Sequence, residues 1–376
     1  MKTSFKLGAT AGALMALGAT ALSAQELPDT MVWTSYDVGS AGYAEASAIA
    51  DAFGKEFGTR VRIQPSGSGI GRLQPLLQGR ADYAFLATEA FFMAEGAFDF
   101  ATPEWGPRAL RAVAGRPAGI TLIAAGDAGI NTVADARGKR IAFVAGNPSV
   151  NVKCEAILAF GGLTLDDVEV VTFPTYSSAM ASMTRNESDA TCTTPTTSQL
   201  YELAESPRGI QYAPLDADNT EGWEALLKIL PIMGPSEEDV AAGLPEGEVA
   251  KMAAYRYPVI TTTVDKSADE VYAFIKALDE TYDIYKDGTA AMSRWTLEKS
   301  GRPAIDVPFH EGAVRYLKEK GIWTAEDDAW NAKRTERMNA LMAAWETFKA
   351  ENADLSEEDY AAAWMTRRDE VVAGLN

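Results

Sequence analysis

Four segments of the chain share one pattern of apolar and polar positions. In each, a short β-rich run ends in a turn of Ser, Gly, Asn or Thr, and an apolar run with helical spacing follows. The predicted strands are Met31–Trp33, Arg60–Ile63, Arg140–Val144 and Val168–Phe173. Each turn leaves backbone N–H groups free at a helix start, where they and the helix dipole attract anions. Two copies lie early and two in the middle of the chain, so we expect two α/β lobes facing each other across an anion-binding cleft.

Further runs extend this pattern in both directions. Continuous β-rich stretches predict strands at Tyr83–Leu86, Ala109–Ala114, Gly119–Ala125, Asp189–Thr193 and Tyr257–Val264. Residues 213–247 are acidic and interrupted by Pro and Gly, which predicts an irregular excursion. Helical spacing dominates from residue 268 onward, and Thr324 with Asp327 forms a capping-box pattern before a long helix.

These segments predict a chain that crosses between lobes twice. We expect lobe 1 over residues 25–122 and 257–300, and lobe 2 over residues 123–256. Residues 301–376 should form a helical C-terminal extension packed on lobe 1. The hinge is expected near Arg116–Gly129 and Tyr255–Thr261.

The first residues have the pattern of an export signal. Lys2 and Lys6 precede an apolar stretch over residues 7–22, and Leu22-Ser23-Ala24 is a small-residue cleavage pattern. This predicts a signal peptide over residues 1–24, cleaved near Ala24. No Cys stands at the cleavage point, which argues against a lipid anchor. We therefore expect a soluble, monomeric protein of the periplasm.

Charge limits the range of partners. The chain carries 53 acidic and 34 basic residues, a formal net charge of −19. Such a chain repels nucleic acid and anionic membranes, so we exclude both as partners. The same field repels an anionic ligand, so its capture has to rest on local donors.

The residues of most catalytic and metal centres are missing. With His310 as the only histidine, a Ser-His-Asp or Cys-His site has a single available base. No Cys/His group has metal-ligand spacing, and Ser66-Gly67-Ser68-Gly69 fits neither a nucleotide fingerprint nor a nucleophile elbow. We predict no catalytic residues, no metal and no cofactor. Cys154 and Cys192 leave two alternatives open, a disulfide or two buried thiols.

With these features in place, the chain resembles a known family. It is similar to the TAXI-type solute receptors of tripartite ATP-independent periplasmic (TRAP) transporters, and the ordered set of motifs fits over about residues 27–300. The matching stretches are Tyr36-Asp37-Val38-Gly39-Ser40-Ala41-Gly42-Tyr43, Pro65-Ser66-Gly67-Ser68-Gly69-Ile70-Gly71-Arg72-Leu73, Gly79-Arg80-Ala81-Asp82, Ala134-Asp135-Ala136-Arg137-Gly138-Lys139-Arg140, Gly146-Asn147-Pro148-Ser149 and Gly161-Gly162-Leu163-Thr164-Leu165-Asp166-Asp167-Val168.

The resemblance implies an α/β, two-lobe type II periplasmic-binding-protein fold and a small organic acid as ligand. It implies delivery of that carboxylate to integral-membrane TRAP subunits driven by an ion gradient. The ligand residues it implies are Ser40, Tyr43, Ser66, Gly67, Ser68, Asn147, Pro148 and Ser149. The chain departs from the family at Arg72, where many members have Asn, and at Asn147-Pro148-Ser149-Val150, where many have Gly-Ser-Gly. A particular amino-acid ligand is therefore not inherited.

Other candidates come from their positions. Arg72 lies at a helix start beside the Ser66–Gly69 turn, where its guanidinium could bind a carboxylate bidentately; the alternative is a surface arginine. Thr88, Tyr176 and Thr194 stand at predicted strand ends, where ligands of open α/β sheets bind. Tyr36 could form a wall of the ligand site or pack on its own lobe.

Three functions are consistent with the sequence. We favour a receptor that hands a small organic acid to a TRAP-type transporter. An exported receptor that presents its ligand to a membrane kinase is the alternative. An enzyme on the same fold is disfavoured because a catalytic set is missing.

Overall fold

The computed structural model of the protein describes Met1 and residues 27–375, so the predicted signal peptide lies outside the described residues. In these residues ten strands form one sheet, eight of them in the order β2-β1-β3-β10-β4-β7-β5-β6, with β8 paired to β4 and β9 paired to β10. The strands are β1 Thr30–Ser35, β2 Arg60–Pro65, β3 Tyr83–Leu86, β4 Leu110–Ala125, β5 Arg140–Val144, β6 Glu169–Phe173, β7 Ala190–Thr193, β8 Ile210–Tyr212, β9 Gly234–Glu238 and β10 Ala250–Thr263.

Thirteen helices are assigned in the described residues. They are α1 Ala41–Phe57, α2 Gly69–Leu77, α3 Glu89–Glu95, α4 Pro148–Phe160, α5 Tyr176–Ser182, α6 Ser198–Glu205, α7 Thr220–Ile229, α8 Ala268–Glu280, α9 Tyr282–Tyr285, α10 Leu297–Ser300, α11 Glu311–Glu319, α12 Ala325–Glu351 and α13 Glu357–Ala373. No helix of this part of the chain is long and apolar enough to span a bilayer.

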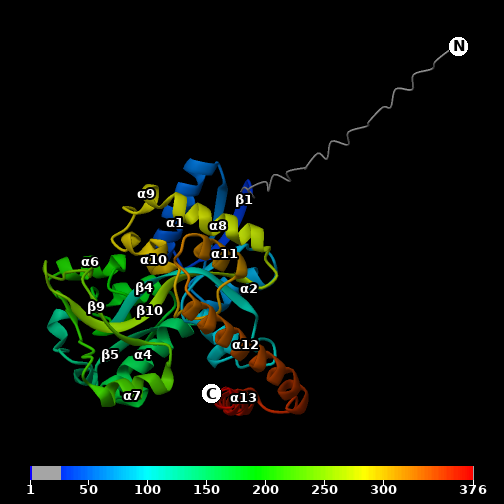
Figure 1. Ribbon diagram of the computed structural model, residues 1–376. Helices are drawn as coiled ribbons and strands as arrows, with labels where there is room; N and C mark the ends of the chain where they lie inside the picture. The colour runs from blue at the N-terminus through cyan, green and yellow to red at the C-terminus, as the bar shows by residue number, and fades with distance from the viewer. Residues whose placement is uncertain (2–26, 376) are drawn as a thin grey trace.

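The chain forms a two-lobe α/β fold, as the sequence predicted. Lobe 1 contains β1, β2 and β3 with α1, α2 and α8, and lobe 2 contains β5, β6 and β7 with α4 to α7 (Figure 1). The long strands β4 and β10 run antiparallel through both lobes. The first half of β4 pairs with the second half of β10 in lobe 1, and the last residues of β4 pair with β7 and β8 in lobe 2.

Two expectations about these crossings were wrong. The two strands predicted at Ala109–Ala114 and Gly119–Ala125 form one strand, β4 (Leu110–Ala125), although Pro117 interrupts the pattern of N–H donors. The partner strand β10 accommodates this proline, because its register against β4 shifts between Arg256 and Val259. Residues 213–247 are also not an irregular excursion, because they contain α7 and β9.

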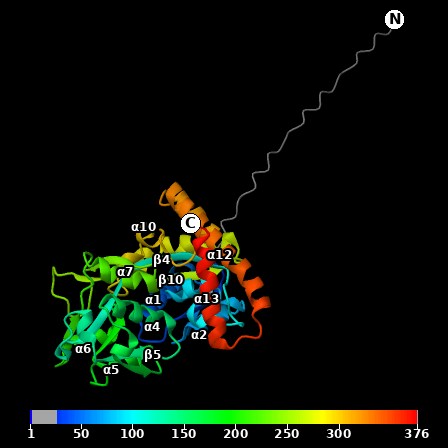
Figure 2. The ribbon, with the colours of Figure 1, turned by 90° about the horizontal axis from the view of Figure 1, so that it is seen from below.

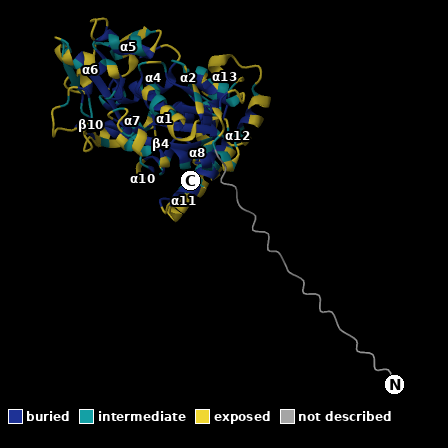
Figure 3. Cartoon of the chain, turned by 90° about the horizontal axis from the view of Figure 1, so that it is seen from above, coloured by how far each residue is buried: buried dark blue, intermediate teal, exposed yellow. Residues whose placement is uncertain are grey.

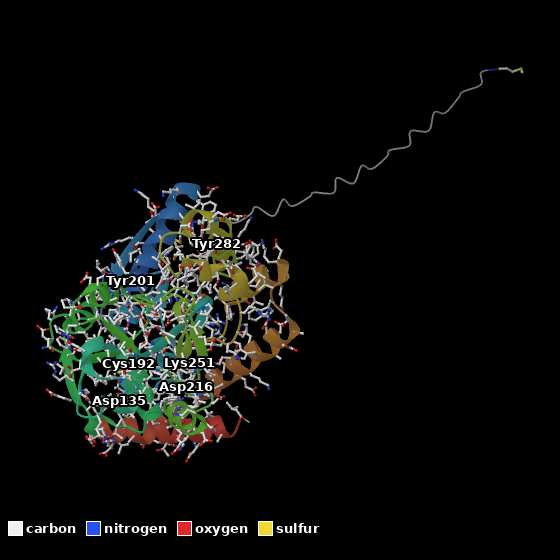
Figure 4. All side chains as sticks on the ribbon, turned by 90° about the vertical axis from the view of Figure 1, so that its left-hand side faces the viewer. Asp135, Cys192, Tyr201, Asp216, Lys251 and Tyr282 are labelled. Carbon is white, nitrogen blue, oxygen red and sulfur yellow. A yellow bond between two sulfur atoms is a disulfide. The ribbon has the colours of Figure 1, made fainter. Side chains whose placement is uncertain are left out.

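One large hydrophobic core extends through both lobes. In lobe 1 Trp33 is fully buried against Phe53, Phe85 and Phe274, with ring centroids 5.4–5.6 Å away. In lobe 2 a disulfide joins Cys154 on α4 to Cys192 on β7, so the disulfide alternative is the one the structure supports. Figure 4 labels Cys192 within lobe 2, while the exposed ion pair Asp216–Lys251 lies near the surface. Buried residues concentrate around β4 and α4 in the view of Figure 3.

The last two helices lie beside lobe 1 and run next to each other (Figure 2). Their aromatic cluster of Trp345, Phe348, Tyr360 and Trp364 is buried. The attachment to lobe 1 centres on Glu95 at the end of α3, whose carboxylate is 3% exposed and pairs with three arginines, Arg334, Arg337 and Arg368. Burial would raise the pKa of Glu95, but these arginines hold it below its usual value.

Candidate functional site

The predicted helix starts of the two lobes face and contact each other. The Gly69 amide of lobe 1 donates to the Gly146 carbonyl of lobe 2 at 3.2 Å, and Asn147 Nδ2 donates to the Gly67 carbonyl at 3.2 Å. A second pair of turns meets where Ser177 Oγ and Ser198 Oγ donate to the carbonyls of Val38 and Gly39, at 3.0 and 2.8 Å. The conformation described is therefore one in which the lobes are closed on each other.

The side chains at these turns are largely used as helix caps. Ser40, Ser68 and Asn147 accept the backbone N–H groups of Tyr43, Gly71 and Val150 and cap α1, α2 and α4. Pro148 occupies the first position of α4, where a missing N–H costs nothing. The residues that the family resemblance implied at these turns thus shape the lobe contact, and most of them lie outside the internal space between the lobes.

That space is a small chamber behind the turns. It is enclosed by ten buried residues from both lobes and from the crossing strands: Tyr36, Ile120, Ser149, Val150, Lys153, Tyr176, Thr193, Thr194, Tyr255 and Tyr257. Its volume of about 20 Å³ is close to that of a single water site. We call it the chamber. A ligand larger than water can occupy it only after the lobes have moved apart and then closed around that ligand.

Parallel strands bring the chamber residues together. Tyr36 follows the end of β1, Tyr176 begins α5 after β6, and Thr193 and Thr194 stand at the end of β7. The carboxyl ends of parallel strands share one edge of a sheet, which is where ligands bind in such folds. The crossing strand β10 contributes Tyr255 and Tyr257, whose rings stack with centroids 5.9 Å apart.

Lys153 supplies the cationic group of the chamber. Its side chain is buried, its Nζ donates to Ser149 Oγ at 3.1 Å, and it lies 4.2 Å from the centre of the Tyr255 ring. Among residues 27–375 it has no ion-pair partner. Burial lowers the pKa of Lys153 to about 8, although Glu89 and Asp306 attract the charge from farther away.

The second charged group near the chamber is already paired. Arg72 is fully buried, with Nε 3.0 Å and Nη2 2.9 Å from Glu89 Oε1, and its Nη1 donates to the Ser66 carbonyl at 2.7 Å. The Tyr36 hydroxyl donates to Glu89 Oε1 at 2.7 Å, and the Arg72 guanidinium lies 3.8 Å from the centre of the Tyr36 ring. Burial would raise the pKa of Glu89, but Arg72, Tyr36 and Lys153 hold it below its usual value.

This environment corrects one expectation for Arg72. The surface alternative was wrong because the side chain is buried. The guanidinium does not line the chamber either, since Tyr36 stands in that wall and Arg72 packs against its ring. Arg72 packs against the Tyr36 ring and pairs with Glu89, and its role at a ligand carboxylate stays a prediction.

Hydroxyl groups complete the walls. The Tyr176 hydroxyl hydrogen-bonds to Thr193 Oγ1 and, at 2.7 Å, to Thr197 Oγ1, and burial raises its pKa to about 12. The Tyr257 hydroxyl accepts the Gly42 amide at 3.0 Å. The tyrosines are therefore neutral hydrogen-bonding groups at physiological pH, and Lys153 carries the only positive charge on the described walls.

The predicted site residues thus divide into two groups. Tyr36, Ser149, Tyr176 and Thr194 line the chamber. Thr88 is buried with an unpartnered hydroxyl at the start of α3 but lies outside it, as do Ser40, Tyr43, Ser66, Gly67, Ser68, Arg72, Asn147 and Pro148. Sequence reasoning missed Lys153, Tyr255 and Tyr257. The signal for Lys153 was its spacing of one helical turn after Ser149.

The chain was compared with family profiles, curated proteins and solved structures. A profile of the NMT1-like family matches residues 37–321. A solved structure from Bordetella bronchiseptica RB50 is 18% identical, with 81% of this chain and 93% of that one covered and a TM-score of 0.46. A periplasmic binding protein from Brucella ovis with glutathione bound is 13% identical, with coverages of 69% and 70% and a TM-score of 0.42.

An arginine-bound variant of the arginine-binding protein of T. maritima is also 13% identical, with coverages of 67% and 95% and a TM-score of 0.40. A comparison with curated proteins finds no match. Structural likeness at these scores carries no argument about ligand or activity, so the interpretation of the site rests on its own geometry.

Proposed function

Because the chain belongs to the NMT1-like family and encloses a polar chamber between two lobes, we propose that it is a periplasmic solute receptor for a small organic acid anion. The receptor closes its lobes on the carboxylate and delivers it to the integral-membrane subunits of an ion-gradient-driven TRAP-type transporter. The resemblance of its turns to TAXI-type receptors supports this choice of transporter.

The buried, unpaired ammonium of Lys153 carries the proposal. A buried charge is costly unless an opposite charge is within reach, and among the described residues Lys153 has only a hydroxyl and an aromatic ring as direct partners. A ligand carboxylate beside Nζ would supply the missing charge in a site from which water is excluded. Tyr176, Thr193 and Thr194 offer hydroxyl groups for the remaining ligand oxygens.

Capture depends on motion between the lobes. We propose that the lobes rotate about β4 and β10, near Arg116–Gly129 and Tyr255–Thr261. On the lobe 1 side of this crossing, Arg116 pairs with Glu45 at 2.5 Å, and Trp295 Nε1 donates to the same carboxylate at 2.7 Å. This anchor in the middle of β4 gives the rotation a fixed base. The ligand favours the closed form because it contacts both lobes only there.

The ligand can be identified as the small molecule that co-purifies with the protein. The exported chain, purified without added solute and denatured, should release an organic acid that mass spectrometry identifies, and calorimetry should then show that acid binding to refolded protein. Recovery of an amine or a sugar as the bound molecule would contradict the proposal, as would conversion of the acid by the protein.

A transport assay separates the proposed partner from a sensory one. Vesicles that contain the TRAP-type membrane subunits should take up the labelled acid only when the receptor and an ion gradient are both present. Binding without receptor-dependent uptake, together with activation of a membrane kinase, would identify the alternative receptor role.

A further inference from the structure

A second hollow lies across β10 from the chamber. It has a volume of about 540 Å³, within the range of small-molecule sites. The two spaces share Tyr255, while Tyr257 lines only the chamber and Ala254 and Arg256 line only the hollow. We call it the hinge groove and define it by Met233, Gly234, Arg256, Asp306, Trp330 and Arg334.

The walls of the hinge groove come from three parts of the chain. Met233 and Gly234 belong to lobe 2, Arg256 lies on the crossing strand, and Trp330 and Arg334 stand on α12 of the C-terminal extension. The remaining lining is apolar and includes Ile232 and Ile305. An apolar body with one polar end fits such a lining better than a fully polar solute does.

The charged groups of the hinge groove favour a ligand with a negatively charged end. Arg256 donates only to backbone carbonyls, those of Gly115, Lys299, Arg302 and Ala304, and has no ion-pair partner among the described residues. Arg334 donates through Nε and Nη2 to the Asp306 carbonyl. Its Nη1 makes no hydrogen bond among the described residues, and Glu95, at 3.7 Å, is shared with Arg337 and Arg368.

The balance of charge in the hinge groove is positive. Burial lowers the pKa of both Arg256 and Arg334. The neighbouring Arg337 and Arg368 lower the pKa of Arg334 further, and Glu95 and Asp306 act in the opposite direction. The one carboxylate of the lining, Asp306, is buried, and burial raises its pKa to about 6, which Lys153 and Arg334 oppose. One negative charge from a ligand is therefore favoured, and a second one near Asp306 is not.

From this geometry we propose that the hinge groove is a second binding site, which takes an apolar monocarboxylate with its carboxylate on Arg334 and its body against Trp330 and Met233. The site borders the chamber through Tyr255, but Arg334, Trp330 and Met233 do not line the chamber, so the site does not depend on the function proposed for it. Because its walls belong to both lobes and to the extension, any rotation about β4 and β10 changes its width.

The test uses 3-phenylpropionate as the probe, with 3-phenylpropylamine as its charge-reversed control, in ligand-observed NMR and calorimetry on the full exported chain. Gly234→Phe fills the groove. Gly234→Ala is the matched control, because a Cβ at this position meets nothing within 4 Å. Arg334→Gln removes the charge, and Lys153→Met removes the charge of the chamber instead.

The carboxylate should bind to the unmodified protein and to Gly234→Ala and Lys153→Met, and the amine should not. Gly234→Phe and Arg334→Gln should each weaken binding at least about tenfold. Thermal unfolding of each variant establishes that it is folded. Undiminished binding to Gly234→Phe would overturn the site. The proposal would also be overturned if Lys153→Met lost binding of the carboxylate, if the amine bound equally well, or if the carboxylate did not bind at about 5 mM.

Discussion

Replacing Lys153 by Met should change stability and ligand affinity in opposite directions. Methionine has a similar length and suits an apolar wall, but it carries no charge. In the ligand-free protein the buried ammonium of Lys153 destabilises the fold. In the proposed complex it is the counter-ion of the ligand. A residue with only a structural role would lose both stability and affinity when it is replaced.

The stability effect follows from the pKa. Lys153 titrates at about 8 in the folded protein against a usual value of 10.5. A difference of this size corresponds to roughly 3 kcal/mol of destabilisation at neutral pH. Because the folded-state pKa is lowered, this penalty is fully present below pH 8 and disappears as the pH rises towards 10.5. Lys153→Met should therefore unfold at higher denaturant concentration than the unmodified protein at pH 7, and the difference should vanish near pH 10.5.

The affinity effect has the opposite sign. Loss of a buried charge-assisted contact with a carboxylate costs roughly 2–5 kcal/mol, which is on the order of 30-fold to several thousand-fold in affinity. In the unmodified protein, affinity for the acid should also fall above pH 8, because Lys153 must take up a proton to bind an anion. The variant should show no such pH dependence.

Calorimetry with the acid that co-purifies with the protein measures the affinity, and urea unfolding measures the stability. Lys228→Met is the matched control, since it removes an exposed lysine from α7 of the same lobe. It should leave both quantities nearly unchanged. If Lys153→Met weakens binding less than about threefold, or if it loses stability at pH 7, the assignment of Lys153 as the anion partner fails.

Four further outcomes are expected. Arg72→Ala should destabilise the protein by about 3–5 kcal/mol because Glu89 is left buried without its partner, and Glu89→Gln in the same chain should recover part of this loss in urea unfolding; an unchanged midpoint for Arg72→Ala would contradict the pairing. Cys154→Ala with Cys192→Ala should lower the free energy of unfolding by about 4 kcal/mol, as estimated for a loop with a sequence separation of 38, and an effect below about 1 kcal/mol would count against a disulfide in the exported protein. Ligand should decrease the radius of gyration in small-angle scattering, and a constant radius at saturation would argue against lobe closure. Intact-mass analysis of exported protein should show a chain beginning near Gln25, whereas retention of Met1 or a lipid adduct would refute cleavage.

The elements that follow local rules were predictable from the sequence. β3 and β5 have the bounds that their β-rich runs predicted, and Thr324 and Asp327 form the expected capping box. The continuity of β4 was not predictable, because it depends on β10 shifting its register opposite Pro117. Local sequence contains no information about how a distant partner strand accommodates a proline.

The candidate site was predictable where it coincides with strand ends and at Ser149, which the family resemblance implied. Tyr36, Tyr176 and Thr194 follow strands, and simple topology gives their positions. Lys153 looks like an ordinary polar residue of a helix, but α4 is buried on most sides, and Tyr255 from a different part of the chain packs against Lys153. Arg72 was judged by its place beside a turn, but its pairing is decided by Glu89 on another helix.

The contrast between paired and unpaired charges is the strongest guide to function in this protein. Arg72 and Arg116 are both buried, and each is neutralised by a carboxylate of its own, Glu89 and Glu45. Such pairs fix the walls of a site, because removing either partner leaves a costly buried charge. Lys153 is equally buried and has no such partner in the part of the chain that the structure describes. A receptor that has to release its ligand again needs a charge whose partner is the ligand itself, and among the residues that enclose the chamber only Lys153 meets this requirement.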